Sequence, residues 1–379
     1  MSFPNYIERS DNMSRIVLKF GGSSVGDESN FFDETHLLKV ASIVKKVKEK
    51  GYEVIVVVSA MAGYTRKLKK MCMEVDTRNN DLESDLVLSS GEQISTGLLS
   101  RILQSSRFNL KAKPFMGWQL PIITNSKFGE SFIKSIDKSK IDECLKNDII
   151  PVIAGFQGVT ENGVITTLGF DGSDTSAVAI ASSAKADVCQ FYKDVRGIYT
   201  ANPRRVKKAK KLDKISSREM YVLSELGARI LHPNSMKTAI KNELTLKIVP
   251  NFIDEEEGTL IVNEDFCGDL AGVTYYEYNR NKVTISVVGK ILEKTDENKI
   301  IKELNRNKIF TEVINTEFDD MSITVEIGWV EQLDVALSSI HRIFNLDSDE
   351  FLDKEAFQGE GKQIYNDPAF KVIEDINNY

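Results

Sequence analysis

Hydrophobic residues in the first two thirds of the chain occur in two alternating patterns. Short, nearly continuous apolar runs, such as residues 15–20 and 52–61, are rich in β-branched side chains and predict buried strands. Between them, residues 36–51 carry apolar side chains at helical spacing, and Gly51 would end that helix. Strands that are apolar along their length and separated by helices indicate a mostly parallel sheet covered on both faces.

The same alternation continues to about residue 262. Two further helices are predicted at residues 89–103 and 174–186. The Asn162-Gly163 pair is typical of a β-hairpin turn between two short strands. The remaining predicted strands cover residues 148–159, 163–169, 187–195, 244–252 and 258–263. These elements predict a large α/β domain over residues 14–265.

After residue 265 the pattern changes to shorter, half-buried elements. The predicted order is strand, helix, strand, strand, helix, and the last helix carries Leu333, Leu337 and Ile340 on one face. This order is typical of a small ferredoxin-like α+β module. We therefore expect a second domain over residues 270–345, followed by an acidic tail over residues 346–379.

Composition narrows the class of protein. The 379 residues are 41% hydrophobic and 28% charged, as in an ordinary globular protein, and a net charge of −7 argues against a general nucleic-acid binder. No apolar run approaches the length of about 20 residues that spans a membrane, and the polar N-terminus does not look like a signal peptide. The four cysteines and three histidines show no metal-ligand spacing. We expect a cytoplasmic protein with reduced thiols and neither membrane nor nucleic-acid partners.

The first predicted strand leads into a glycine-rich turn. Gly21 and Gly26 have the spacing of a P-loop, but Asp27 and Glu28 stand where its lysine and hydroxyl residue should follow. The cation is Lys19, which precedes the glycines. Its ammonium could reach over a turn whose N–H groups face an anion, although an ordinary surface lysine before a turn would look the same.

A second glycine-rich stretch, residues 163–181, leads into a helix of small residues. Such a loop can bring backbone amides to a phosphate at the helix N-terminus. It contains Asp171 and Asp174 but no cation, and the bulky Phe170 stands in its turn. Lys19 could supply the missing positive charge.

Three other stretches carry polar residues at the ends of predicted elements. Ser59 and Thr65 follow a buried strand, and Glu92 lies in the first turn of a helix. Glu92 could only stabilise the helix dipole, a contribution of about 0.5 kcal/mol, or it could accept the ammonium of a substrate. A later loop offers three side chains suited to a nucleotide, namely Asp194, Tyr199 and Arg204.

Together these motifs resemble the aspartate kinases of the amino acid kinase family. The resemblance runs from Val17 to about Val262, and the later module looks like an ACT regulatory domain. The motifs occur in the family's order, as KFGGSSV, VVSAMAG, SSGEQ, TTLGFDGSDTSA, KDVRGIYTANPR and GARILHP.

The resemblance implies a three-layer α/β/α fold and a phosphoryl transfer. MgATP would donate its γ-phosphoryl group to the side-chain carboxylate of L-aspartate, giving 4-phospho-L-aspartate, the first step toward lysine, threonine, methionine and diaminopimelate. A carboxylate is already a nucleophile, so catalysis would rest on positioning and charge neutralisation. A homodimer or higher homo-oligomer would form through the ACT-like module.

The resemblance also implies roles for individual residues. Lys19 would hold the transferring phosphoryl group, Asp174 would orient the catalytic cations, and Arg229 would be the second cation near the phosphates. The residues that would bind ATP and its phosphates are Lys19, Gly21, Gly22, Ser23, Asp194, Tyr199, Arg204 and Arg229. The residues that would line the acceptor site are Ser59, Thr65, Glu92, Phe170, Asp171, Gly172 and Ser173.

The chain departs from the family pattern at several positions. Phe170 stands where the family usually has an arginine that clamps a substrate carboxylate, and we expect another cation, Arg66 or Arg196, to compensate. Arg229 replaces a usual lysine. In the nucleotide loop Lys193 and Asn202 replace a usual threonine and aspartate.

These departures leave two alternatives to an aspartate kinase. One is a related carboxylate kinase with a different acceptor, which Phe170 would favour. The other is a catalytically weak subunit that regulates a partner, against which the retained charges of Lys19, Glu92 and Asp174 argue. Because only one ACT-like module is predicted, and its first loop lacks a glycine-bearing turn, we expect weak or no inhibition by lysine and threonine.

Overall fold

A computed structural model describes the greater part of the chain in two compact units. The described residues are 14–28, 34–78, 80–169, 171–251, 258–264, 270–289, 292–314, 318 and 321–346. The first unit comprises residues 1–196, 216–221 and 229–265, and the second comprises residues 197–215, 222–228 and 266–379. Phe170 and the predicted acidic tail beyond Leu346 lie outside the described residues. The domain boundaries at 265 and 345 remain predictions.

The main sheet has eight strands, and all but part of β12 lies in the first unit. In spatial order they are β12 (Lys214–Ser216), β14 (Thr259–Val262), β13 (Thr245–Pro250), β9 (Val188–Lys193), β1 (Arg15–Phe20), β2 (Glu53–Val58), β6 (Ile150–Ala154) and β3 (Ala112–Phe115). From β13 to β3 all neighbouring strands are parallel, and β14 pairs antiparallel with β13. The predicted mostly parallel sheet is confirmed.

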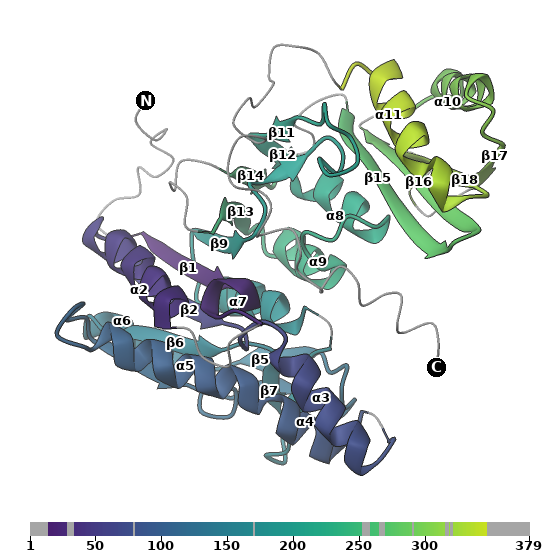
Figure 1. Cartoon of the computed structure of the whole chain (residues 1–379). Coiled ribbons are helices and arrows are strands. Elements are labelled where there is room, and N and C mark those ends of the chain that lie inside the picture. Colours follow the sequence, from purple (N-terminus) through teal and green to yellow (C-terminus); the bar gives the residue numbers. More distant parts are fainter. Residues whose placement is uncertain are drawn as a thin grey trace. The chain divides into compact units, whose positions relative to one another are not determined.

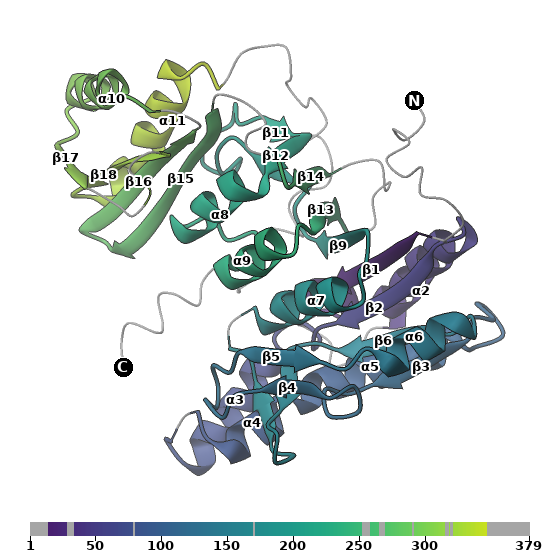
Figure 2. The ribbon, with the colours of Figure 1, turned by 180° about the vertical axis from the view of Figure 1, so that it is seen from behind.

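Helices cover both faces of this sheet. Those that lie wholly in the first unit are α1 (Gly22–Val25), α2 (Glu34–Glu49), α3 (Tyr64–Val75), α4 (Leu82–Leu88), α5 (Ser90–Leu103), α6 (Ser139–Lys146), α7 (Gly172–Ser183) and α9 (Pro233–Lys241), while α8 (Ser217–Glu225) crosses the division. Figures 1 and 2 show α2 and α5 on one face and α6 and α7 on the other. Leu18, Val56 and Leu99 are among the fully buried residues between the first pair and the sheet. The fold is therefore the predicted α/β/α arrangement.

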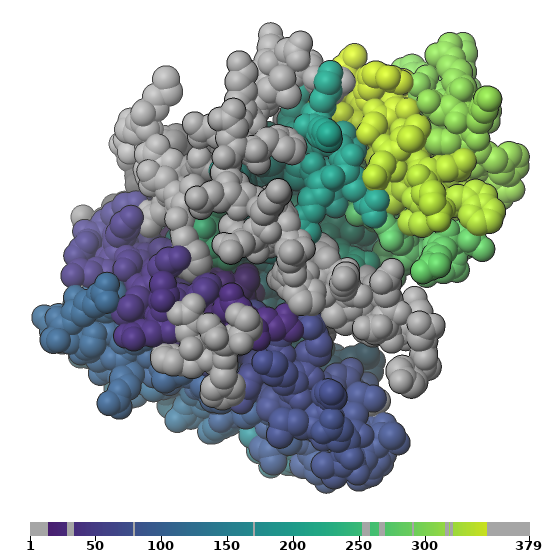
Figure 3. Space-filling view, in the orientation of Figure 1, coloured from purple at the N-terminus to yellow at the C-terminus, as the bar shows by residue number. Residues whose placement is uncertain are grey.

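The hydrophobic pattern does not predict α3 and α4. They form the blue lobe at one end of the first unit in the space-filling view of Figure 3, and they expose Met71, Val75 and Leu86. The predicted hairpin is confirmed: β7 (Gln157–Val159) and β8 (Ile165–Thr167) pair antiparallel. They lie in a second small sheet with β4 (Ile122–Thr124) and β5 (Ile133–Ile136).

The second unit contains the predicted α+β module. Its antiparallel sheet has the order β15 (Leu270–Asn279), β16 (Lys282–Gly289), β18 (Ser322–Ile327) and β17 (Thr311–Ile314). Its helices are α10 (Lys294–Arg306) and α11 (Leu333–Ile343), with a short 3₁₀ helix over Val330–Gln332. The order from β16 to α11 agrees with the predicted strand, helix, strand, strand, helix. β15 precedes this series and completes the sheet beside β16.

A segment from the middle of the chain also belongs to the second unit. Residues 197–215 contain the paired strands β10 (Ile198–Tyr199) and β11 (Lys211–Leu212). Ala201 and Val206 are buried in the second unit's hydrophobic core. Arg205 donates to Glu277 at 2.7 Å and to Asp334 at 2.7 Å. The second half of the predicted nucleotide loop is therefore held by the C-terminal module.

Two observations bear on the compositional expectations. None of the helices built from the described residues has the length and apolar character needed to cross a membrane. Cys72, Cys144 and Cys189 are free thiols, and Cys267 lies outside the described residues.

Candidate active site

Charged and hydroxyl side chains gather at the carboxyl ends of three adjacent parallel strands. Lys19 is near the end of β1, Ser59 follows β2, and Lys193 is the last residue of β9. Ligands of open α/β sheets bind at this edge. Leu18 and Phe20 point into the core with α2 and α5, so strand alternation turns Lys19 to the opposite face, toward α7.

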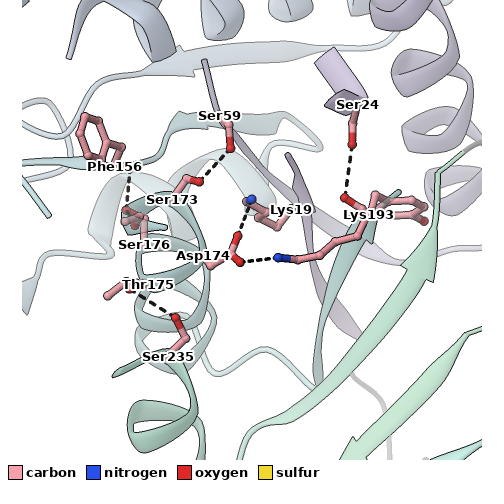
Figure 4. Close-up of polar contacts among 12 residues, drawn as sticks. Lys19, Ser24, Ser59, Phe156, Ser173, Asp174, Thr175, Ser176, Lys193 and Ser235 are labelled. Atoms are coloured by element: carbon pink, nitrogen blue, oxygen red, sulfur yellow. Dashed lines mark hydrogen bonds and ion pairs between the residues drawn. The ribbon is translucent and has the colours of Figure 1, made fainter. Parts of the chain in front are cut away.

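A buried aspartate on α7 binds two lysines. Asp174 lies in the first turn of α7 and is 1% exposed, and Lys19 is 4% exposed. One carboxylate oxygen of Asp174 forms an ion pair with Lys19, and Lys193 Nζ lies 2.8 Å from the other oxygen (Figure 4). Burial alone would raise the pKa of Asp174, but the two ammonium groups lower it to about 2. Asp174 is therefore ionised and holds both cations in fixed positions.

The glycine-rich turn after β1 lies against the loop after β2. The position of a Cβ on Gly22 would be 3.1 Å from the carbonyl oxygen of Ala60, so a larger residue would push the two loops apart. Ser24 N donates to Gly21 O at 3.0 Å, and the Ser24 hydroxyl donates to Asn251 Oδ1 at 2.7 Å. A Cβ on Gly21 would be 3.7 Å from Lys19 Nζ, so the turn begins beside this ammonium, while phosphate binding by Gly21, Gly22 and Ser23 stays a prediction.

The predicted acceptor residues approach the cluster from β2 and α7. The hydroxyl oxygens of Ser59 and Ser173 are 2.8 Å apart (Figure 4). Asp171 precedes α7 with φ 51°, a left-handed conformation that turns the chain into the buried Gly172. Thr65 is half-buried near the start of α3. Phe170 was predicted in this group but lies outside the described residues.

Glu92 is buried in the first turn of α5, with 3% of its surface exposed. The Ala60 N–H donates to its Oε1 at 3.0 Å, while its Oε2 has no hydrogen-bond partner among the described residues. Burial raises the pKa of Glu92 to about 8. A carboxyl can stabilise a helix dipole while exposed to water, and burial without a second hydrogen bond is costly. The geometry therefore favours a carboxyl that binds a substrate group through Oε2.

The structure does not bring every predicted residue to the cluster. Asp194 follows Lys193 and is half-buried. Tyr199 and Arg204 belong to the second unit, so they are not placed relative to Lys19. Arg229 is exposed, and within the described residues no hydrogen bond or ion pair joins its side chain to Lys19 or Asp174.

Of the two cations expected to compensate for Phe170, Arg66 has a defined partner. Its side chain is 43% exposed and forms an ion pair with Glu28 at 2.9 Å. Arg196 is half-buried in the loop after β9. Neither compensating role is tested by these contacts.

Two charged side chains, the half-buried Lys193 and the buried Asp85, have no role among the predictions from the sequence. Lys193 appears there only as a departure from the family pattern. Its signal was its place two residues beyond Phe191, which pairs with Lys19 across β9 and β1. Asp85 on α4 accepts from the N–H and hydroxyl of Thr167 at 2.7 Å and 2.6 Å, and so anchors the chain before Phe170.

Comparisons with known proteins agree with this arrangement. Residues 14–250 match the Amino acid kinase family. An aspartokinase from Rickettsia bellii is 38% identical over 278 residues, which span 73% of this chain and 66% of that protein. An aspartokinase from Bacillus sp. strain MGA3 is 35% identical over 370 residues, which span 96% of this chain and 88% of that protein.

A solved structure supports the fold. The crystal structure of E. coli aspartokinase III in complex with aspartate and ADP superimposes with a TM-score of 0.72 at 18% identity, covering 87% of this chain and 99% of that one. At this identity the likeness speaks for the fold alone. With the family match over most of the first unit and relatives aligned along nearly the whole chain, this protein belongs to the amino acid kinase family, among its aspartokinases.

Proposed function

We propose that this aspartokinase transfers the γ-phosphoryl group of ATP to the side-chain carboxylate of L-aspartate, giving ADP and 4-phospho-L-aspartate. The observation that carries the proposal is the Lys19–Asp174–Lys193 cluster at the carboxyl edge of the sheet, beside a buried Glu92 whose Oε2 has no hydrogen-bond partner within the described part of the chain. The aspartokinases to which the chain is similar support the choice of substrate. We expect the protein to act in the cytoplasm, where both substrates occur.

The reaction needs no general base from the protein. A carboxylate oxygen of aspartate attacks the γ-phosphorus while the bond from that phosphorus to the β,γ-bridging oxygen breaks, and the bond's electrons leave with ADP. No proton has to be removed from an ionised carboxylate. The ammonium of Lys19 and the backbone N–H groups near Gly21 and Gly22 stabilise the negative charge on the transferring group.

Mg²⁺ enters this proposal as part of the substrate MgATP. Both oxygens of Asp174 are paired with lysines, and among the described residues no group of three or more His, Cys, Asp or Glu side chains could hold a metal. Mg²⁺ is commonly bound through substrate phosphates and water rather than by a protein cage. When bound, it would neutralise phosphate charge, and Lys19 would complete that neutralisation from the protein side.

The acceptor site suits an amino acid. The Oε2 of Glu92 can accept a hydrogen bond from the substrate ammonium. Ser59, in the loop that also holds Glu92 through the Ala60 N–H, pairs its hydroxyl with that of Ser173 on α7. An uncharged acceptor would leave Glu92 without a partner. A different amino-acid-like acceptor would carry the same ammonium, and it is the similarity to aspartokinases that argues against this alternative.

The direct test is an assay of ADP release with a panel of amino acids. Hydroxylamine in the same reactions traps an acyl phosphate as a hydroxamate, which identifies the product class. We expect release and trapping with L-aspartate above the other amino acids. Release with another amino acid alone would favour a different acceptor, and no release with any of them would favour the regulatory subunit.

Phe170→Arg tests whether Arg66 or Arg196 replaces the arginine that the family usually has. If neither does, a bidentate contact between the new arginine and the substrate carboxylate should lower the KM for aspartate about tenfold. KM for ATP should not change. An unchanged KM for aspartate would show that another cation already binds this carboxylate, as the sequence analysis expects.

The second unit should mediate homodimerisation. Among the described strands, β17 pairs only with β18, and it exposes Val313, three residues after the exposed Phe310. We expect the full chain to sediment as a dimer or higher oligomer, and Phe310→Asp combined with Val313→Asp to shift it to monomer. Val335→Asp, at an exposed apolar residue of helix α11, is the control. A wild-type monomer would contradict the prediction.

A further inference from the structure

Lys193 is a half-buried cation that the proposed reaction does not yet use. Its side chain is 18% exposed, and its ammonium contacts an aspartate that already has Lys19 as a partner. One lysine would be enough to neutralise Asp174. Burial alone would lower the pKa of Lys193, but the carboxylates of Asp174, Asp171 and Asp194 raise it, so the ammonium keeps its charge at the edge of the sheet.

The strand register places this second ammonium on the same face as the first. Lys19 pairs with Phe191, and Lys193 is two residues further along β9, so both side chains point toward α7. Asp174 lies between them and binds each with a different oxygen (Figure 4). These three side chains carry one net positive charge at the edge of the sheet where ligands bind, and the carboxylates of Asp171 and Asp194 also act on the Lys193 ammonium.

The strand order shows on which side of Lys19 this charge lies. β9 and β2 flank β1 on opposite sides. Ser59 follows β2 and meets Ser173, so the proposed acceptor residues lie on the β2 side. Lys193 ends β9 on the other side. In an in-line transfer the attacking acceptor and the leaving phosphates lie on opposite sides of the transferring phosphorus. A cation on the side away from the acceptor therefore faces the phosphate chain of the donor.

We propose that Lys193 is a second catalytic cation, whose ammonium binds a non-bridging oxygen of the β- or γ-phosphate of ATP while Lys19 binds the transferring γ-phosphoryl group. This inference rests on the proposed ATP-dependent function. Asp174 holds the two ammonium groups at a fixed separation before the nucleotide binds, which reduces the reorganisation needed on binding. Lys193 keeps its proton throughout, and no new bond to it forms.

The test compares a ligand with phosphates and one without. Calorimetry in EDTA measures the affinity of the full-length protein for Mg²⁺-free ADP and for adenosine. Lys193→Met should weaken ADP binding about 10- to 100-fold, the loss expected for one charge-assisted hydrogen bond, and leave adenosine binding unchanged. Lys193→Arg should retain most of the ADP affinity.

Lys48→Met is the matched control. Lys48 also has an 18% exposed side chain and an ion pair, at 2.6 Å with Asp148, but it lies on α2 away from the cluster. Its substitution should change neither affinity. Equal weakening of ADP and adenosine by Lys193→Met would show a structural role and overturn the proposal. A raised KM for aspartate with unchanged ADP affinity would assign Lys193 to the acceptor and also overturn it.

Folding is checked by thermal unfolding of each variant. Should Lys193→Met not fold, Lys193→Gln replaces it, because its amide can still donate to Asp174 while the positive charge is lost. ADP affinity of the glutamine variant within twofold of wild type would refute the proposal. If the wild-type protein binds neither ADP nor adenosine, both the proposed function and the proposed role of Lys193 fail. If the wild type binds both and the variants match it, only the role of Lys193 fails.

Discussion

Lys19→Ala should lower kcat by about 10²- to 10³-fold, since a preorganised charge directed at a transition state contributes about 3–4 kcal/mol. The ammonium of Lys19 is buried, fixed by Asp174 and next to the glycine turn, so no mobile side chain or solvent cation can easily replace it. Asp174 would keep Lys193 as a partner, and the fold should therefore survive the substitution. Single-turnover measurement of phosphoryl transfer, with both substrates saturating, isolates this effect from binding.

Lys48→Ala is again the control, because it removes an ion-paired lysine of the same unit that is remote from the cluster. Its turnover should remain at the wild-type level. If Lys19→Ala retained more than about a third of wild-type turnover while folded, the assignment of Lys19 to the transferring phosphoryl group would be wrong, because that loss corresponds to less than about 1 kcal/mol.

Strands β1, β2, β6, β9, β13 and β14 of the main sheet could be predicted from the sequence, whereas the short strands β3 and β12 were not. The runs at β1 and β2 are almost entirely apolar, as is typical of a parallel strand that is buried on both faces. The run at 52–61 is predicted too long: the strand ends at Val58, and Ser59 to Met61 leave the sheet to form the loop beside Glu92. Hydrophobicity does not distinguish those loop residues, since small residues suit both a strand end and a tight loop.

Long-range packing could not be predicted from local patterns. Residues 197–215 follow β9 in the chain, yet Ala201 and Val206 are buried with α10 and α11. Nothing in their spacing indicates which core receives them. Helices α3 and α4 were not predicted, although Leu68, Met71 and Val75 of α3 have helical spacing; of these three residues only Leu68 is buried.

The candidate site was predictable where a residue type is unusual for its position. Lys19 near the end of an apolar strand and Glu92 at the start of an apolar helix are each a charged residue where an apolar one is usual. Each is therefore a candidate site residue from its local sequence. The pairing of Asp174 with two lysines depends on the register of β1 with β9 and on the placement of α7, which a single sequence does not contain. Likewise, the sequence left two readings of Glu92 open, and its burial favours one of them.

Burial of Glu92 makes aspartate binding dependent on pH. With a pKa of about 8, Glu92 is mostly protonated at pH 6–7 and must release its proton to pair with the substrate ammonium. The KM for aspartate at saturating ATP should therefore fall as pH rises from 6 toward 8, by up to about tenfold per pH unit. Aspartate binding at pH 7 should release nearly one proton, which calorimetry detects as a heat that varies with the ionisation enthalpy of the buffer.

Glu92→Gln should abolish both effects. The amide cannot ionise, so the KM for aspartate should rise about 10- to 100-fold at pH 8, where the wild-type ion pair is available, and should lose its dependence on pH. The KM for ATP serves as the internal control and should stay constant in both proteins. Equal changes in the two KM values would instead indicate that Glu92 supports α5 and not the substrate.

The pH dependence of the free energy of unfolding, compared between the wild type and Glu92→Gln, tests the raised pKa of Glu92 independently of substrate binding. The pKa of Glu92 is raised from 4.5 in an unfolded chain to about 8 in the fold, so the folded state binds the proton more tightly. Its contribution to stability is complete below about pH 4.5 and is lost as pH rises through 8. Wild-type stability in urea should thus decline between pH 5 and 8 relative to Glu92→Gln. A wild-type curve parallel to that of the variant would mean that Glu92 titrates normally, and the pH dependence of aspartate binding would then need another source.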